Sequence, residues 1–378
     1  MDFAYVRDGV SALPELLDLV AMSLLWMDHA HRRRPRSRAR TSDDGSEPVP
    51  APVEALLDLE AALAALSAKD VTHRAATLRI RAAAALEQAR TLGIAAVGRP
   101  DAAYPPALAI IGDPPPVLWV CGSLDPASPA VAVVGSRAAT PHGLDMAFEL
   151  ARDLARAGVV VVSGLARGID SAAHRGALRG EGPTLAVMGS GPNVIYPPEH
   201  ADLAAQIAAL GAVLSELPPG APPRSWHFPR RNRIIAGLSS AVVVVEAAIG
   251  SGSLITAGCA LEQNRAVMAV PGGVLGGHNR GAHGLLRDGA RIVESVQDVL
   301  EELQLDGSGL AGAGEAPPND PVLAAMVPGE QYDLGGLCLS CGLDAARTLA
   351  HLAELELTGW ISRAGGGRFV RSRANVLR

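Results

Sequence analysis

The sequence has little of several residue types that common enzyme and membrane classes need. Its 378 residues include one lysine, Lys69, which lies far from any glycine-rich loop. A Walker A loop requires a Gly-Lys-Ser/Thr sequence and imine chemistry requires a lysine, so we expect neither. There is also no run of 18 apolar residues and no signal-peptide pattern. We therefore expect a cytoplasmic protein that makes no contact with membranes.

Cysteine is scarce as well, with four residues at positions 121, 259, 338 and 341. These are too few and too scattered for a disulfide framework. Cys338 and Cys341 form a single C-x-x-C, whereas a structural zinc site needs four ligands. The sequence thus predicts no metal and no cofactor, and we interpret the pair as two small side chains one helical turn apart.

The overall charge is negative, which restricts the ways in which the chain could bind nucleic acid. The formal net charge is −6, and only 3% of the residues are aromatic. A nucleic-acid-binding protein of this kind must concentrate its positive charge locally. With 48% hydrophobic residues the chain has enough apolar material for more than one domain.

The most informative segment is Ser163 to Ala173, Ser-Gly-Leu-Ala-Arg-Gly-Ile-Asp-Ser-Ala-Ala, which follows a valine strand and opens onto a helix. Gly164 and Gly168 permit a tight turn, and Arg167 adds a cation. We expect Asp170 or Ser171 to cap the helix, and the loop amides to hold an anion.

A second strand end repeats this design at Val131 to Arg137. Gly135 and Ser136 leave room for a ligand there, while Arg137 offers a planar cation to phosphate. A dinucleotide fingerprint starting at Gly135 would need glycines at 137 and 140, but these positions are Arg137 and Thr140. The two loops together favour a chain of phosphates as the ligand.

Arginines and aromatics are concentrated between Arg224 and Arg233. Flat side chains under bases and cations along the backbone are typical of single-stranded nucleic acid binding. The candidate residues here are Trp226, Phe228, Arg230, Arg231, Asn232 and Arg233, and a further loop adds Ser251, Ser253 and Thr256. The alternative is that the aromatics are core residues and the arginines a solvated helix face.

Two carboxylates, Glu216 and Glu246, follow predicted strands and invite a catalytic interpretation. The nearby histidines, His174 and His227, lie in different loops, which argues against a shared catalytic cluster. We expect the two glutamates to pair with the arginines of 230–233 instead, because buried charges must be paired.

These motifs, together with Tyr-Pro-Pro at 196–198, Val-Val-Glu-Ala at 244–247 and Val-Pro-Gly at 270–272, occur in the order seen in the DNA-processing protein A (DprA, also called Smf) family, which the chain resembles. The resemblance implies an extended Rossmann-like protein that binds and protects incoming single-stranded DNA. It further implies a homodimer that loads the recombinase RecA during natural transformation. We expect no enzymatic activity, because the sequence has no Walker A lysine, no His/Cys metal cluster and no carboxylate pair with an adjacent base. Segment 283–293 resembles the part that meets the twin, with Leu285, Leu286 and Ile292 as apolar anchors or, alternatively, as plain core residues.

Periodicity predicts five segments. Residues 1–48 form an N-terminal segment with a helical stretch at 13–27 and a disordered basic tail, and 49–103 form a helical region. Residues 104–303 alternate apolar strands (131–134, 159–162, 184–188, 212–214, 241–245, 266–270) with helices, which predicts an α/β fold with a mostly parallel sheet. Residues 304–320 have the composition of a flexible linker.

The last segment, 321–378, is expected to be a winged helix of three helices (321–327, 334–341, 343–356) and a hairpin from residue 359. Its predicted recognition helix from Asp344 contains one arginine and three carboxylates, although a major-groove reader should be basic. This favours protein contact or weak duplex binding.

A nucleotide-processing hydrolase of the phosphoribohydrolase type remains the alternative function. Such enzymes place a glutamate shortly after a Pro-Gly-Gly-x-Gly-Thr loop. Here the loop from Pro271 lacks the Gly-Thr, and the next glutamate is Glu294.

Overall fold

The computed structural model describes residues 13–32, 59–65, 70–305, 320–327, 329–358, 360–364 and 366–371. The predicted disordered stretch from 33 to 48 and the predicted linker residues 306–319 lie outside the described residues. Within the described ranges, no helix combines the length and the apolar character needed to cross a membrane.

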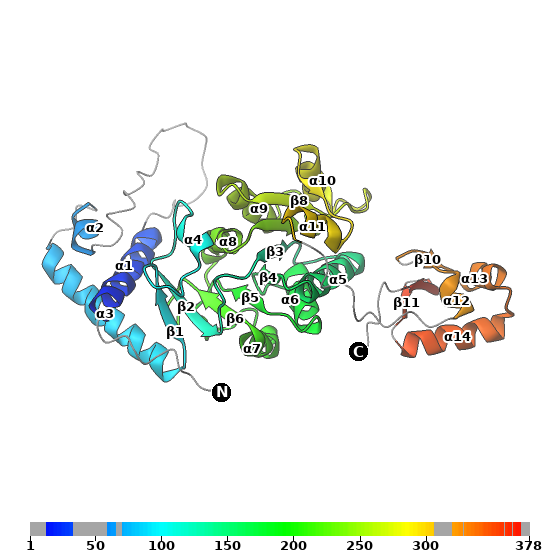
Figure 1. The fold of residues 1–378 in the computed structure, drawn as a ribbon, viewed down its shortest axis with the longest axis horizontal. Coiled ribbons are helices and arrows are strands. Elements are labelled where there is room, and N and C mark those ends of the chain that lie inside the picture. The colour runs from blue at the N-terminus through cyan, green and yellow to red at the C-terminus, as the bar shows by residue number, and fades with distance from the viewer. Residues whose placement is uncertain are drawn as a thin grey trace.

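The centre of the molecule is a nine-stranded sheet in the order β1-β2-β6-β5-β4-β3-β7-β8-β9 (Figure 1). Its strands are β1 (Ala95–Gly98), β2 (Val117–Gly122), β3 (Ala130–Val134), β4 (Val160–Ser163), β5 (Thr184–Val187), β6 (Ala212–Ser215), β7 (Ala241–Val244), β8 (Ala266–Ala269) and β9 (Arg291–Ile292). All neighbours from β6 to β9 pair in parallel, whereas β1 and β2 are antiparallel. The predicted mostly parallel sheet and its six apolar strands are confirmed.

Helices cover the sheet on both faces because its central strands are apolar on both sides. Val131 and Val133 face a core made with α5 (Pro141–Arg156), α6 (Ile169–Arg179) and α11 (Val296–Glu302). Val134 and Val244 face the other core, made with α4 (Pro106–Ala109), α8 (His227–Gly237), α9 (Gly252–Glu262) and α10 (Arg280–Arg287). Helix α7 (Ala201–Leu210) covers β5 and β6. The carboxyl ends of β3, β4 and β7 therefore open between two helical layers.

The stretch expected to be helical, 49–103, also contains a strand. Helices α2 (Leu59–Ala65) and α3 (Val71–Thr91) lie in it, but β1 joins the sheet as its edge strand. The Ala-Ala-Val-Gly sequence of β1 has one β-branched residue, so local propensity gave no signal, and antiparallel pairing with β2 determines its structure. With α1 (Leu13–Arg32), these helices pack on the buried side chains of Val117 and Trp119 in β2.

The C-terminal unit is the predicted winged helix. It contains α12 (Pro321–Ala324), β10 (Gln331–Tyr332), α13 (Leu334–Cys341), α14 (Ala345–Leu357), β11 (Ile361–Ala364) and β12 (Arg368–Arg371). The hairpin tip places Gly366 and Gly367 at φ 76° and 73°, the left-handed region that glycine favours. Leu323, Leu352 and Phe369 are among the residues of its separate core.

Both cysteines of the C-x-x-C lie in α13. The Cys341 thiol donates to the Leu337 carbonyl, and the Cys338 thiol lies 3.4 Å from the Thr348 hydroxyl. Across the part of the chain that the structure describes, no group of three or more His, Cys, Asp or Glu side chains is placed to hold a metal.

Candidate nucleic-acid interface

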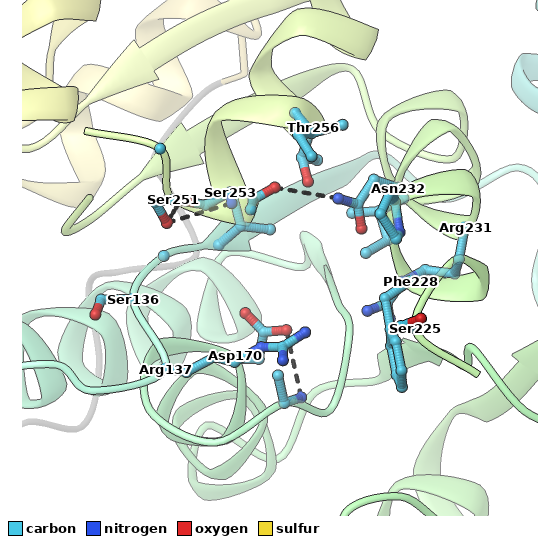
Figure 2. A pocket seen from close by; sticks show the side chains of 18 of the residues that line it. Ser136, Arg137, Asp170, Ser225, Phe228, Arg231, Asn232, Ser251, Ser253 and Thr256 are labelled. Carbon is cyan, nitrogen blue, oxygen red and sulfur yellow. Dashed lines mark hydrogen bonds between the residues drawn. The ribbon is translucent and has the colours of Figure 1, made fainter. Parts of the chain in front are cut away.

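A cavity of about 790 Å³ opens at the carboxyl ends of β3 and β7 (Figure 2). The loop after β3 forms one wall, α8 another, and the loop from β7 to α9 the third. Of the predicted site residues, the cavity brings together Gly135, Ser136, Arg137, Phe228, Arg231, Asn232, Ser251, Ser253 and Thr256. Gly164, Arg167, Gly168, Trp226, Arg230 and Arg233 are not among its lining residues.

A cation and two aromatic rings among the lining residues contact one another. The Arg137 guanidinium lies 5.4 Å from the centre of the Phe228 ring, and Arg137 is exposed. The Tyr196 ring packs at 5.5 Å and 44° to the Phe228 ring. A Cβ at position 189 would lie 2.8 Å from the Phe228 ring, so Gly189 is needed for this ring position. This group offers an aromatic surface with a positive charge over it.

Beneath this surface lies a buried pair, Asp170 and Arg231. The Asp170 carboxylate accepts hydrogen bonds from the amides of Gly164 (3.1 Å) and Ala166 (3.3 Å). The Arg231 guanidinium donates to the Val187 carbonyl. Burial raises the pKa of Asp170 and lowers the pKa of Arg231 to about 10, while each partner's charge opposes the shift of the other. The pair fixes the floor of the cavity.

This arrangement corrects the predicted helix cap and anion loop. The residue at the N-cap of α6 is Gly168, and no side chain caps the helix there. The Ser171 hydroxyl donates to the Gly168 carbonyl, and Asp170 binds two of the amides that were expected to hold an anion. Asp170 lies in the first turn of α6, and its carboxylate accepts from amides of the loop that precedes this helix. Short acidic side chains form such local bonds to backbone amides that lack a partner in the helix.

The rest of the loop is held from the segment after Tyr196. Leu165 has φ 57°, an unfavourable value for a bulky residue, and its carbonyl lies 2.9 Å from His200 Nδ1. Arg167 donates from Nε to Glu199 at 2.6 Å. Arg167 is thus engaged at the surface, and the segment 196–200 connects this loop to the Phe228 ring.

Glu246 holds the turn that carries Arg137. Its side chain is 2% exposed and accepts hydrogen bonds from the Thr140 amide (3.2 Å) and hydroxyl (2.6 Å), and its carbonyl accepts from the Ser136 amide at 2.7 Å. The expectation that Glu246 pairs with an arginine of 230–233 is therefore wrong. The N-terminus of α5 supplies neutral donors to this carboxylate, so it needs no cation.

Glu216, by contrast, pairs with arginines as expected. Its carboxylate binds Arg233 Nη2 at 2.7 Å and Arg230 Nε at 3.3 Å. Arg233 also binds Asp113 at 3.0 Å, and its side chain is 12% exposed. The structure places Arg233 in this ion-pair network under α8, so the phosphate contact expected of it does not fit its position.

The third wall supplies hydroxyl groups. The Ser251 side chain accepts from the Ser253 amide at the start of α9, and the two hydroxyls are 2.8 Å apart. The Asn232 side chain donates to the Gly252 carbonyl at 3.2 Å and thereby connects α8 to this loop (Figure 2).

Trp226 and the two histidines considered for catalysis lie outside the cavity. The Trp226 ring is covered by the Arg224 guanidinium at 5.2 Å. His174 is fully buried and shares a 2.8 Å hydrogen bond with the Thr184 hydroxyl, while His227 contacts the Gly189 carbonyl. Neither histidine shares a catalytic arrangement with Glu216 or Glu246.

Arg224, one of the four arginines of the predicted 224–233 cluster, lines the cavity. Some lining residues were not predicted: Tyr196, Ser225, Ile249, Ile255 and, as a lining group, Asp170. Tyr196 had a signal, because it is one of four tyrosines and stands before two prolines at a strand-to-helix connection. The isoleucines had none, since exposed aliphatic side chains in a loop look like ordinary surface.

Known proteins resemble this chain in sequence and fold. A family model described as DNA recombination-mediator protein A matches residues 95–304. The chain belongs to this family. A second model, described as the DprA winged helix domain, matches residues 311–367.

Named relatives of the DNA recombination-mediator protein A family are similar over most of the chain. Protein Smf from Escherichia coli is 43% identical over 71% of this chain and 75% of its own length. DNA processing protein DprA from Streptococcus pneumoniae is 47% identical over 54% of this chain and 72% of its own. The X-ray structure of the Streptococcus pneumoniae protein superimposes with a TM-score of 0.57 at 38% identity, over 66% of this chain and 93% of that one.

A structure of DNA processing protein A from Helicobacter pylori, described for its single-stranded DNA binding mode, has a TM-score of 0.51 at 29% identity. It covers 56% of this chain and 95% of its own.

Proposed function

We propose that the chain binds single-stranded DNA in the cavity between α8, the loop after β3 and the loop before α9. The observation that carries this proposal is the exposed Arg137 guanidinium over the partly buried Phe228 ring. A nucleobase stacks on a ring, and a guanidinium binds the adjoining phosphate. The guanidinium lies 5.4 Å from the ring centre, so we propose that the base and the phosphate of one nucleotide bind this pair together.

The proposed contacts divide into two groups. Arg137, Phe228 and the hydroxyls of Ser136, Ser251 and Ser253 line the cavity and are proposed to touch the strand. The other group is proposed to hold the cavity walls in place without touching the strand. It consists of Arg230, Arg231 and Arg233, each of which already interacts with Glu216, Asp170 or a carbonyl. Phosphate neutralisation in the cavity then depends mainly on Arg137.

We further propose that the bound strand is protected and passed to the recombinase RecA during natural transformation. The names of the relatives support this: a model called DNA recombination-mediator protein A, and relatives called DNA processing proteins. No chemical step on DNA is proposed, because the carboxylates near the cavity hold amides or arginines in place.

A homodimer through the 283–293 segment is part of the proposal. Ile292 is 51% exposed on the edge strand β9, while Leu285 and Leu286 pack partly against the core. Ile292 is therefore the residue with enough exposed surface to contact the second copy, and the two leucines hold the segment against the core.

The test is fluorescence anisotropy of labelled oligo(dT) titrated with the protein. Phe228→Ala removes the stacking surface and should weaken binding by about 1–3 kcal/mol. Arg137→Ala should weaken binding and reduce the slope of log affinity against log salt by roughly 0.7, the value for one lost phosphate contact.

Arg175→Ala is the matched control. Arg175 is exposed on α6 and is not one of the lining residues, so its loss should leave affinity and slope nearly unchanged. An unchanged slope for a folded Arg137→Ala protein would remove Arg137 from the site. Release of free base from nucleoside monophosphates, abolished by Glu246→Ala, would favour the hydrolase instead.

A further inference from the structure

Helix α14 of the winged helix carries two apolar faces on opposite sides. Thr348, Leu352 and Leu355 are buried and face the core of the domain. A second set, spaced as i, i+3, i+4, i+7 and i+11, is exposed: Ala346, Leu349, Ala350, Ala353 and Leu357. At 100° per residue the second set falls within an arc of roughly 100°, on the far side of the helix from the first.

This exposed apolar stripe is unusual for a helix that only meets solvent. Leu357 is 80% exposed and Leu349 is 45% exposed. In a winged helix this helix is the one expected to enter the major groove, yet its charged residues are Arg347 and the carboxylates of Glu354 and Glu356, after Asp344 at its N-cap. Phosphates would repel such a helix, so the stripe fits a protein better than DNA.

The charged residues beside the stripe are placed so that two antiparallel copies of α14 bring opposite charges together. Arg347 and Glu354 are seven residues apart and lie on the same flank, because seven residues make almost two full turns. When two copies of α14 run antiparallel about a two-fold axis, the same flanks adjoin. An axis between Ala350 and His351 then places Arg347 of each copy opposite Glu354 of the other.

The side chains of the stripe suit this arrangement. Three of its five residues are alanines, which allow two helices to approach closely, and the two leucines fill the space at either side of the centre. Arg347 is 74% exposed and has only a weak contact with Asp344 at 3.6 Å, so it is available to a partner. His351 does not interfere, since it points to Asp320 at 2.5 Å.

We propose that the exposed stripe of α14 docks on α14 of a second copy of this chain, antiparallel and about a two-fold axis. This surface is distinct from the 283–293 segment of the core. The proposal does not depend on single-stranded DNA binding.

The test is sedimentation velocity of the full chain over a range of concentrations, with charge-reversal variants of the two exposed residues. Arg347→Glu alone creates two Glu–Glu contacts per pair, and Glu354→Arg alone creates two Arg–Arg contacts. Each variant should self-associate at least about tenfold more weakly at the α14 step. A mixture of the two single variants should regain association, because every contact between unlike copies is then complementary. The doubly reversed chain should also regain it.

Arg368→Glu is the matched control, since it reverses a charge on β12 away from the stripe and should leave the association unchanged. Single variants that associate like the parent, or a mixture that does not recover, would overturn the proposal. Loss of duplex DNA binding in both single variants with unchanged self-association would also overturn it, by assigning the stripe to nucleic acid.

Discussion

Helices α8 and α14 distribute their side chains in opposite ways. Helix α8 buries polar residues: Arg231 is 4% exposed and Asn232 8%. Helix α14 exposes apolar ones, with Leu357 at 80%. A polar group is buried only where a partner compensates its lost hydration, and an apolar stripe stays exposed at a cost unless something covers it. The comparison indicates that α8 is built around a fixed polar site, whereas α14 presents a surface for docking.

The strongest test of the contrast between α8 and α14 removes the buried cation of α8. Arg231→Met leaves the Asp170 carboxylate buried without its cation, which should lower the free energy of unfolding by about 3–5 kcal/mol. Urea denaturation measures the change. The paired variant Asp170→Asn/Arg231→Met should recover much of the loss, because no buried charge then remains. Equal instability of the single and paired variants would show that Arg231 acts through packing alone.

The next effect concerns pH and the buried His174. Burial lowers its pKa to about 3, and the nearby Arg231 adds to this shift. The unfolded chain takes up a proton near pH 6.5, so the stability from neutral His174 is complete above that pH. It is lost as pH falls towards 3, by roughly 1.4 kcal/mol per pH unit.

Denaturation curves at pH 7, 5.5 and 4.5 test this effect. His174→Asn should flatten the pH dependence, whereas His73→Asn, at an exposed position, should not. If the parent and the His174→Asn protein lose stability in parallel, His174 is not the group responsible.

A smaller effect on DNA affinity tests whether Glu246 acts through Arg137 and does not bind the strand itself. Glu246 holds the turn of Arg137 through Thr140 and Ser136, so Glu246→Gln should weaken single-strand binding by acting on Arg137. In the Arg137→Ala background the same change should cost about 1 kcal/mol less, because the group it positions is gone. Anisotropy with oligo(dT) on the four proteins gives this coupling. Strictly additive losses would mean that Glu246 acts elsewhere.

The smallest expected effect is on single-strand affinity when the winged helix, with α14, is removed. A chain ending at Leu305 keeps the leucines that close the core, Leu303 and Leu305, and lacks α14. We expect its affinity for single strands to change by less than about 0.5 kcal/mol, as is usual for changes remote from a site. Loss of most of the affinity would move the DNA site into the winged helix.

Much of the fold was predictable, because its signals are local. Valine runs with helical crossovers predicted the parallel strands, and the glycine hairpin predicted the wing. Strand β1 was missed because antiparallel pairing with β2, not its own sequence, makes it a strand.

The site was predictable by residue type but not by role. The motifs identified Arg137 and Phe228, which meet across the cavity. They did not show that Asp170 binds its own loop, that Glu246 holds an amide and a hydroxyl, or that Arg233 is enclosed by two carboxylates. These roles depend on distances between segments far apart in the sequence, and residue identity alone does not encode them.

The packing of the N-terminal helices on β2 has a consequence for where this protein can be cut. The family model begins at residue 95, after α3, which would suggest that the preceding helices are an optional addition. However, α1 and α3 cover Val117 and Trp119, and the Ser23 hydroxyl reaches the Glu216 carbonyl at 3.4 Å. A protein trimmed to the family boundary would present an uncovered tryptophan and valine to water next to an open sheet edge, which is a surface prone to aggregation. We therefore expect a stable protein to need the helices that precede the residues matched by the family model.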